Sequence, residues 1–409
     1  MASRARPHPP RPHPLTRASL VDRSNAGLAR AWDRGWLPEP SLDPDQLWAI
    51  AGKSFGAKAA SFERAGRHPD DVSDFRERLV RLTDSAKIEA RLNPLGRTIA
   101  HGQLVRVLRR RLKFGKLWSE RPELLDTDLA PPIVVIGHMR SGTTRVHRLL
   151  AADPRHSSTR FCDSWHPVPT WPDMRTFWGG LNLMIARRLN PWIDAIHPMA
   201  SGRVEEELGW LAGALNHATY ETQWQIPSYT AFSEQAEADA IYREFARVLR
   251  TDAAHRANAT KPRVLKVPQF SEDLPSLLEQ FPDARLVVAT REDAAVVRSA
   301  VSLVANQMTI QSDAVELPWI EAECRRKLAL RSERMEAFIA RWQGPIAQLQ
   351  FDALGADWEA EIARTYAALG LELTSDALAA MRREMQATED CHHHAHAEQL
   401  AQFDRAPAE

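Results

Sequence analysis

The chain has 409 residues, of which 44% are hydrophobic and 26% are charged. These values are typical of a globular protein and exclude a fibrous or largely disordered chain. The 53 lysine and arginine residues balance 53 aspartate and glutamate residues, so the formal net charge is zero. This balance excludes a positive electrostatic potential over the whole protein, which would attract nucleic acid or an anionic membrane. It does not exclude a local binding site for an anion.

The first residues and the cysteines give expectations about the environment of the protein. Residues 1–25 are rich in proline and arginine and contain few apolar residues, so we expect a flexible arm that is not a secretory signal. Cys162, Cys324 and Cys391 are far apart and form no CxxC pair, which fits a reducing, cytoplasmic location. The sequence contains no run of about 18 consecutive apolar residues, so we expect no membrane-spanning helix.

The region from 26 to 128 is predicted to be helical. Apolar residues recur there at spacings of three and four, as at Phe75, Leu79 and Leu82. Asp43 and Pro44 form a helix start signal, in which the aspartate caps the helix and the proline is its first residue.

The pattern changes after residue 128 and predicts an α/β domain from 129 to 409. Four consecutive apolar residues, Ile133 to Ile136, follow two prolines and indicate a strand that is buried on both faces. Two more strands are predicted at residues 263–267 and 285–290, each followed by a helix. Strands that alternate with helices predict a parallel β-sheet flanked by helices. The tail from about 345 to 409 is predicted to be mostly helical.

A glycine-containing loop joins the first predicted strand to the next helix. It reads G-H-M-R-S-G-T-T from residue 137 to 144, in the frame G-x-x-x-x-G-x-T, which is close to a phosphate-binding P-loop. Backbone N–H groups of such a loop, together with a helix N-terminus, form a cradle for an anion. An ATPase or GTPase has lysine at the position of Thr143, whereas here the positive charge lies at Arg140. The candidate ligand-binding residues are Arg140, Ser141, Gly142, Thr143 and Thr144.

Two segments of this chain resemble a known family. PIVVIGHMRSGTTRVHRLLAADPRH is similar to the 5′-phosphosulfate loop of bacterial sulfotransferases that use 3′-phosphoadenosine 5′-phosphosulfate (PAPS), although Met139 and Arg145 replace the usual proline and leucine. LKVPQFSEDLPSLLEQFPDARLVVATREDAAVVRSAVSL is similar to the family's 3′-phosphate segment, in which a strand ends in arginine and a serine follows eight residues later. Those residues are Arg291 and Ser299 here, and an arginine with a serine suits a dianionic phosphate.

The resemblance covers about residues 130–310 and implies a PAPS-dependent sulfotransferase (EC 2.8.2.-) with a P-loop NTPase-like fold. Such an enzyme would transfer a sulfuryl group to a hydroxyl or amine of a small-molecule or glycan acceptor, with 3′,5′-ADP as the second product. It would need no metal and no nucleic acid partner, and a homodimer is one option for its assembly. The tryptophan-rich segment from about 160 to 260 is expected to form a helical insertion. Its aromatic residues would line an acceptor pocket or pack a core.

In-line sulfuryl transfer needs a cation at the leaving phosphate oxygen and a base at the acceptor. Arg140 is the first candidate for the cation, and Lys266, at the end of a neighbouring predicted strand, is the second. For the base, the resemblance points to an acidic run before a helix, in which Glu206 is the first candidate and Glu205 the second. His138 inside the loop is a rival base. In the alternative interpretation, the acidic residues only stabilise a helix N-terminus.

Two other functions stay open at this level. A P-loop kinase or NTPase would have lysine before threonine in the loop and a strand that ends in a Mg²⁺-binding aspartate, and Thr143, Lys266 and Arg291 argue against it. A catalytically inactive nucleotide-binding module would keep the fold without the chemistry. The histidine-rich segment 392–396 is open to three interpretations: a solvated helix, a role near the active site, or a metal site.

Overall fold

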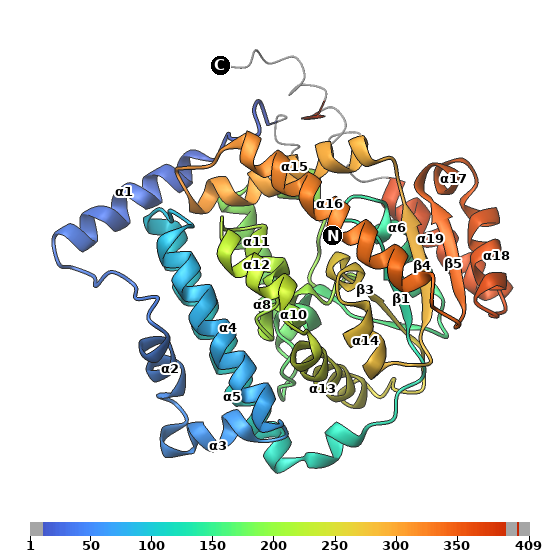
Figure 1. Cartoon of the computed structure of the whole chain (residues 1–409), viewed down its shortest axis with the longest axis horizontal. Coiled ribbons are helices and arrows are strands. Elements are labelled where there is room, and N and C mark those ends of the chain that lie inside the picture. The colour runs from blue at the N-terminus through green and yellow to red at the C-terminus, as the bar shows by residue number, and fades with distance from the viewer. Residues whose placement is uncertain (1–10, 390–398, 401–409) are drawn as a thin grey trace.

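The computed structural model describes residues 11–389 and 399–400. It contains a parallel β-sheet flanked by helices, which lies on the right-hand side of the molecule in Figure 1. The strands are β1 (Ile133–Ile136), β2 (Ser157–Ser158), β3 (Arg263–Lys266), β4 (Arg285–Thr290) and β5 (Ile346–Gln350). Their order across the sheet is β2-β3-β1-β4-β5, and each pairing is parallel. The predicted α/β class with a parallel sheet is therefore confirmed.

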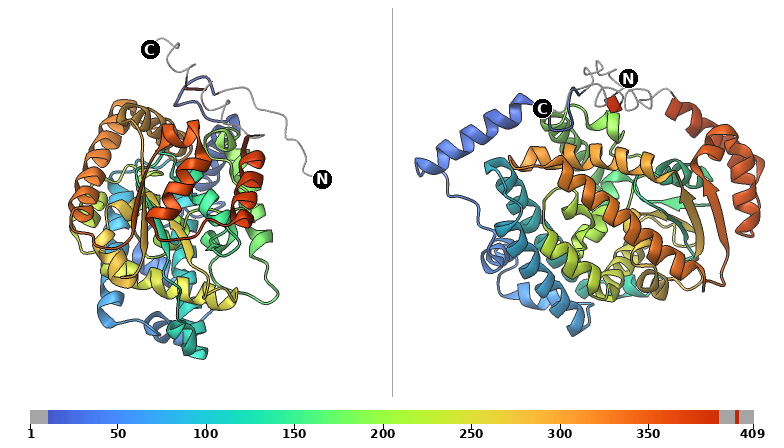
Figure 2. Two further views of the ribbon diagram at one scale, coloured as in Figure 1. Left: turned by 90° about the vertical axis from the view of Figure 1, so that its right-hand side faces the viewer. Right: turned by 45° about the horizontal axis from the view of Figure 1, so that its top comes forward.

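Helices precede the sheet, separate its strands and cover both of its faces (Figure 2). Before β1 lie α1 (Ser19–Asp33), α2 (Pro44–Gly52), η1 (Gly56–Lys58), α3 (Ala59–Arg64), α4 (Pro69–Ile88), α5 (Pro94–Glu120) and η2 (Pro122–Asp126). Between β1 and β3 lie α6 (Thr143–Ala152), α7 (Phe161–Trp165), α8 (Arg175–Leu189), α9 (Ile193–Ile196), α10 (Leu208–Gly213), α11 (His217–Glu221), α12 (Pro227–Gln235) and α13 (Asp239–His255). The remaining elements are η3 (Pro268–Ser271), α14 (Leu274–Gln280), α15 (Asp293–Gln311), α16 (Leu317–Ile339), α17 (Phe351–Ala356), α18 (Trp358–Ala368) and α19 (Ser375–Glu389).

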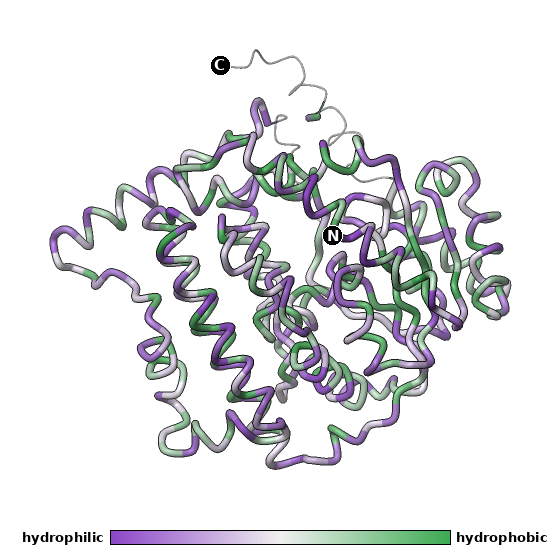
Figure 3. The backbone as a smooth tube through the Cα atoms, viewed as in Figure 1, coloured by the Kyte–Doolittle hydropathy of each residue, from purple (hydrophilic) through white to green (hydrophobic). Residues whose placement is uncertain are grey.

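β1 lies at the centre of the sheet because it is apolar on both faces. Val134 and Ile136 pack in one hydrophobic cluster with residues of α13 and α14. Ile133 and Val135 point to the opposite face, as alternate residues of a strand do, and pack with α6, α18 and α19. Hydrophobic residues accordingly concentrate on the strands and on the helix faces that cover them (Figure 3). β1 thus carries the following loop at a fixed place on the carboxyl edge of the sheet.

The N-terminal helices pack mainly beside the insertion between β2 and β3, and the end of α5 reaches the cluster on the sheet through Phe114 and Trp118. Leu79 of α4 and Leu104 of α5 share a buried cluster with Tyr220 and Trp224 of the insertion. The predicted start of α2 is present, with Asp43 accepting a hydrogen bond from the N–H of Gln46 and Pro44 as the first helical residue. None of the helices in the described ranges combines the length and the apolar character that crossing a membrane requires.

Two local features of the structure were not predicted. α1 begins at Ser19, inside the segment 1–25 that we expected to be a flexible arm, and Val21 of this helix is fully buried. The described part of the tail from 345 is mostly helical, as predicted, but it also contains the strand β5. β5 alternates buried Ala347 and Leu349 with exposed Gln348 and Gln350, as an edge strand does. Its five residues give no continuous apolar run, so the signal that indicated β1 is missing.

The central position of β1 gives a stability test. Ile136 is fully buried, so we expect Ile136→Val to lower the free energy of unfolding by about 1 kcal/mol through loss of one methylene group. Ile88 of α4 is 79% exposed, and the same substitution there is expected to change stability by no more than about 0.5 kcal/mol. Denaturant unfolding of both variants measures the difference, and equal effects would contradict the assignment of β1 to the core.

Candidate active site

The loop from Gly137 to Gly142 turns tightly between β1 and α6, and its two glycines are required by the backbone. Gly137 has φ 140°, and a Cβ atom there would lie 2.3 Å from the carbonyl oxygen of Ala289 on β4. Gly142 has φ 89°, and its Cβ would lie 2.3 Å from the ring of Phe351. Arg140 between them has φ 69°, in the left-handed region that non-glycine residues rarely adopt. Such conformations concentrate at ligand-binding sites.

The N-terminus of α6 opens toward this loop. α6 begins at Thr143 without a side-chain cap, which leaves its first amide groups for another acceptor such as an anion. The hydroxyl of Ser271 in η3 accepts the N–H of Gly137 at 3.0 Å and fixes the start of the loop. Ser141 donates its own hydroxyl to the carbonyl of His138 at 2.7 Å. The Ser141 side chain therefore braces the loop, in addition to any role of its backbone.

The two motifs of the sequence meet at Arg140. Its Nε donates to the hydroxyl of Ser299 on α15 at 2.8 Å, and its Nη1 donates to the carbonyl of Ile196 at 3.0 Å. Arg291, which follows β4, donates to the carbonyl of Arg140 at 3.1 Å and stacks 4.4 Å above the ring of Phe351. Burial, together with the charge of Arg291, lowers the pKa of Arg140 to about 10, so this guanidinium stays charged at neutral pH.

Lys266 at the end of β3 brings a second cation to the start of α6. Its side chain is 2% exposed, and its Nζ donates to the hydroxyl of Thr144 at 3.0 Å and pairs with the carboxylate of Glu206. The backbone N–H of Lys266 donates to Glu207 at 2.9 Å. A buried ammonium group is stable only with such partners. The pairing holds a carboxylate beside the predicted anion site.

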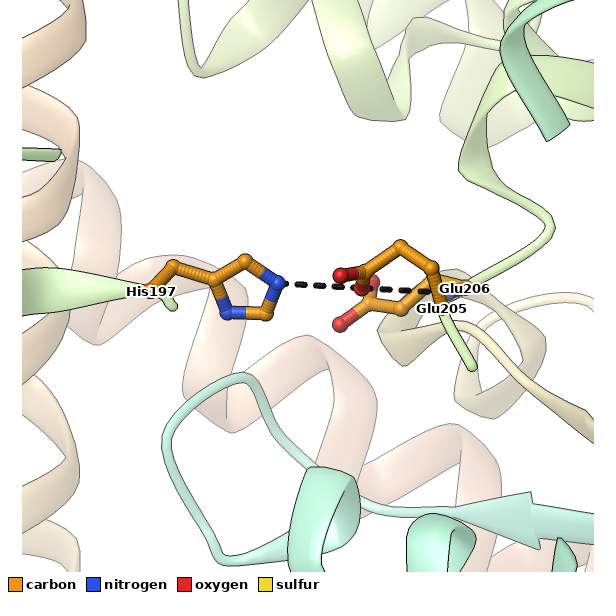
Figure 4. A group of neighbouring side chains, drawn as sticks. All are labelled: His197, Glu205 and Glu206. Atoms are coloured by element: carbon orange, nitrogen blue, oxygen red, sulfur yellow. Dashed lines mark hydrogen bonds and ion pairs between the residues drawn. The ribbon is translucent and has the colours of Figure 1, made fainter. Parts of the chain in front are cut away.

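Glu205 and Glu206 lie side by side near His197 (Figure 4), but they contact different partners. Glu205 is buried and contacts Nε2 of His197 at 3.0 Å, and it accepts the backbone N–H of Glu206 at 3.1 Å. Burial alone would raise the pKa of Glu205, but His197 and Arg148 lower it well below its ordinary value. The Glu206 side chain is 16% exposed and pairs with Lys266. Glu206 is therefore the more exposed of the two carboxylates and shares Lys266 with Thr144 at the start of α6, whereas Glu205 contacts His197.

Two groups of side chains in the described residues have the spacing of a metal site. The three residues of Figure 4 place their ligand atoms within 4.8 Å of one another, but Lys266 already pairs with this group. The second group encloses the ammonium of Lys327, which lies 2.9 Å from His217, 2.7 Å from Glu234 and 2.9 Å from Glu272. In each group a lysine supplies the positive charge that a metal would bring, so we assign neither group to a metal.

Three contacts of the site were not predicted from the sequence: those of His197, Ser271 and Glu207. Their partners lie 8, 134 and 59 residues away in the sequence, respectively, so no local motif indicates these contacts. The predicted candidate His138 places its Nε2 3.1 Å from the hydroxyl of Ser332 on α16. Burial, with the charge of Arg331 next, lowers the pKa of His138 to about 4 and keeps it neutral. Cys391 and the histidine-rich segment 392–396 lie outside the described residues.

The carboxyl group of Glu207 gives a prediction about pH. Burial raises the pKa of Glu207 from 4.5 to about 7, although the hydrogen bond from the backbone N–H of Lys266 acts to lower it. Because the folded state holds this proton more tightly than the unfolded state, the stabilisation is present below the unfolded pKa and is lost as the pH rises to about 7. We expect Glu207→Gln to raise the free energy of unfolding at pH 8 by up to about 3 kcal/mol, and by little at pH 4.5. Denaturant unfolding at both pH values tests this, and an equal gain at both would contradict it.

Comparisons with known proteins agree with this architecture. The model of the sulfotransferase family matches residues 131–376. The crystal structure of sulfotransferase STF1 from Mycobacterium tuberculosis H37Rv is similar, with 26% identity, a TM-score of 0.72, and coverage of 90% of this chain and 100% of that chain. Sulfotransferase STF9 from Mycobacterium avium shares the fold, with 20% identity, a TM-score of 0.71, and coverage of 89% of this chain and 97% of that one. No curated protein matches the chain.

The family match spans more than half of the 409 residues and includes the loop, β3, β4, α15 and the acidic run before α10. The similar structures extend the likeness to the N-terminal helices. The chain belongs to the sulfotransferase family.

Proposed function

We propose that the protein transfers a sulfuryl group from PAPS to a hydroxyl or amine of a small-molecule or glycan acceptor (EC 2.8.2.-), with 3′,5′-ADP as the second product. The contact of Arg140 with Ser299 carries this proposal. This contact joins the loop after β1, which suits a phosphosulfate, to α15. α15 and the end of β4 together suit a 3′-phosphate. PAPS has these two anionic groups, whereas a nucleoside triphosphate has no 3′-phosphate.

In the donor site we propose, the backbone of the loop and of Thr143 and Thr144 holds the phosphosulfate at the start of α6. Arg291 and Ser299 bind the 3′-phosphate. Arg140, which bonds Ser299 and Ile196 here, turns to the 5′-phosphate when an anion offers it a stronger, charge-assisted partner. Ser141 contributes its backbone, since its hydroxyl braces the loop.

In the transfer step, the acceptor oxygen forms a bond to sulfur as the bond from sulfur to the 5′-phosphate oxygen breaks. Arg140 and Lys266 stabilise the charge that develops on the leaving phosphate. Glu206 takes the proton of the acceptor group. Its pairing with Lys266 directs it to the start of α6, where the sulfuryl group would lie. Glu205 acts through His197 and the backbone of Glu206 as a positioning residue.

A P-loop kinase is not supported, because Thr143 replaces the P-loop lysine, Lys266 ends β3 and Arg291 follows β4. The mechanism proposed here uses side-chain cations in the place where a kinase uses Mg²⁺, so no metal is part of it. We also place the protein in the cytoplasm, which is supported by Cys162 and Cys324, both free thiols.

The donor site is tested by removing the proposed 3′-phosphate ligands. Arg291→Ala is expected to weaken binding of 3′,5′-ADP by about 100-fold, and Ser299→Ala by about tenfold, because a charged hydrogen bond contributes more than a neutral one. Neither variant should change the affinity for 5′-AMP, which lacks the 3′-phosphate. Calorimetric titration of the three proteins measures these affinities. Parallel losses for both nucleotides would contradict the assignment of the 3′-phosphate site.

The proposed base is tested by Glu206→Gln, which keeps the size of the side chain and removes its basicity. We expect release of 3′,5′-ADP from PAPS, with added phenol as acceptor, to slow by about 100-fold or more, while the affinity for 3′,5′-ADP is kept. Glu205→Gln is the neighbouring control and should cost less. An unchanged rate in Glu206→Gln would show that Glu206 is not the base. Absence of any turnover in folded wild-type protein that binds 3′,5′-ADP would favour the inactive nucleotide-binding module.

A further inference from the structure

Helix α8 and the turn before it carry a stripe of exposed apolar side chains that the proposed donor site does not use. The stripe is formed by Met174, Phe177, Trp178, Met184 and Ile185, whose spacings of three, four and seven place them on one side of the helix. With Trp171, they are six of the eleven large hydrophobic side chains that are exposed in the described part of the chain. Such a concentration marks an interaction surface, whereas scattered exposed side chains do not.

The same helix presents positive charge on its exposed side. No aspartate or glutamate occurs between residues 174 and 193, whereas Arg187 and Arg188 lie at the end of α8. Arg187 is held by Asp194, with 2.6 Å between Nε and Oδ2. Arg188 is exposed and forms no ion pair with a described residue. The surface of α8 therefore combines apolar side chains with an unpaired guanidinium group.

A second group of cations lies on α5. Arg106, Arg110 and Lys113 recur at spacings of four and three, and no aspartate or glutamate occurs between residues 106 and 113. Among the described residues, none of the three forms an ion pair, and Nη2 of Arg110 is buried without an acceptor. Burial lowers the pKa of Arg110 only to about 10, so it stays charged at neutral pH. Cations without counter-ions favour an anionic partner.

His166 links the cations of α5 to the stripe on α8. Its Nε2 lies 2.9 Å from Nδ2 of Asn182 on α8. Asn182 follows Trp178 by four residues and precedes Ile185 by three, so it borders the stripe. Burial, and then the positive charges of the three α5 side chains, lower the pKa of His166 to about 4. The apolar stripe and the basic side chains of α5 are therefore neighbours on the surface.

This combination fits an anionic lipid surface better than a second copy of the chain. In a two-fold symmetric dimer the same surface faces itself, so Arg188 and the cations of α5 would meet further cations. Like charges across an interface are unfavourable. A bilayer instead offers an apolar layer bordered by phosphates. Tryptophans such as Trp171 and Trp178 favour this boundary, and arginine and lysine are attracted to anionic headgroups.

We propose that α8, Trp171 and the basic side chains of α5 form a docking surface for an anionic phospholipid bilayer. The stripe enters the boundary between the headgroups and the acyl chains, without any element crossing the bilayer. Arg188 and the exposed cations Arg106 and Lys113 contact the lipid phosphates. This docking does not depend on the proposed function.

The docking surface is joined to the segment that leads to Glu206. Arg187 of α8 donates to the carbonyl of Met199 at 2.7 Å. Ser201 donates its hydroxyl to the carbonyl of Thr176 on α8 at 2.6 Å. A bilayer that docks on α8 therefore borders the segment before the proposed base.

Co-sedimentation of the full chain with vesicles tests the docking surface. The vesicles contain either phosphatidylcholine alone or phosphatidylcholine with about 30% phosphatidylglycerol. We expect the wild-type protein to bind the anionic vesicles about tenfold more tightly or better, and less tightly in about 0.5 M salt. Trp178→Glu, which places a charge in the stripe, should weaken this binding by about tenfold or more. The double variant Arg106→Gln, Lys113→Gln should weaken it by about tenfold and leave binding to neutral vesicles unchanged.

Ile88→Glu is the matched control, because Ile88 is 79% exposed on α4 and the variant adds the same charge outside the stripe. It should bind vesicles as the wild type does. All variants should keep the wild-type midpoint of denaturant unfolding, since they change exposed side chains. Absence of vesicle binding by the wild type, equal binding to both kinds of vesicle, or an unchanged affinity in Trp178→Glu would overturn the proposal. A dimer that light scattering detects in the wild type and not in Trp178→Glu would assign the stripe to a second copy and would also overturn it.

Discussion

The ammonium group of Lys266 is the charge on which the site depends. It is almost fully buried at the carboxyl edge of the sheet, where an unpaired charge would be costly. Thr144 at the start of α6 and Glu206 from the insertion supply its partners, so one lysine ties together β3, α6 and the segment before α10. The same pairing fixes a carboxylate beside the loop. The same ion pair therefore supports both the fold and the proposed chemistry. The close approach of β1 and β4 at Gly137 brings the loop near Lys266.

The fold was largely predictable because its central strands carry unusual sequence signals. Ile133–Ile136 is apolar at every position, as required of a strand covered by helices on both faces, and Arg285–Thr290 is nearly so. β2 and β5 were not predicted. β2 has two residues, and β5 alternates apolar residues with glutamine at the edge of the sheet, so neither gives a continuous run. The start of α1 was missed because the burial of Val21 depends on tertiary contacts.

The candidate site was predictable where a residue belongs to a motif and unpredictable where its role comes from a distant partner. The loop and the Arg291–Ser299 pair follow from the two motifs, and the structure joins them at Arg140. The acidic run indicated a carboxylate, but only the structure separates Glu206, which pairs with Lys266, from Glu205, which holds His197. A cavity beside His138 is lined by α15, α16 and residues between 221 and 230, so no single stretch of sequence indicates it.

In the function we propose, the loop and the end of β4 form one site for a nucleotide with two anionic groups. Calorimetric titration of the wild-type protein with 3′,5′-ADP, and separately with ATP in the presence of Mg²⁺, tests this most directly. We expect tight binding of 3′,5′-ADP without Mg²⁺ and much weaker binding of ATP, because only 3′,5′-ADP places a phosphate between Arg291 and Ser299. Preference for ATP with Mg²⁺, or no binding of either nucleotide to folded protein, would contradict it.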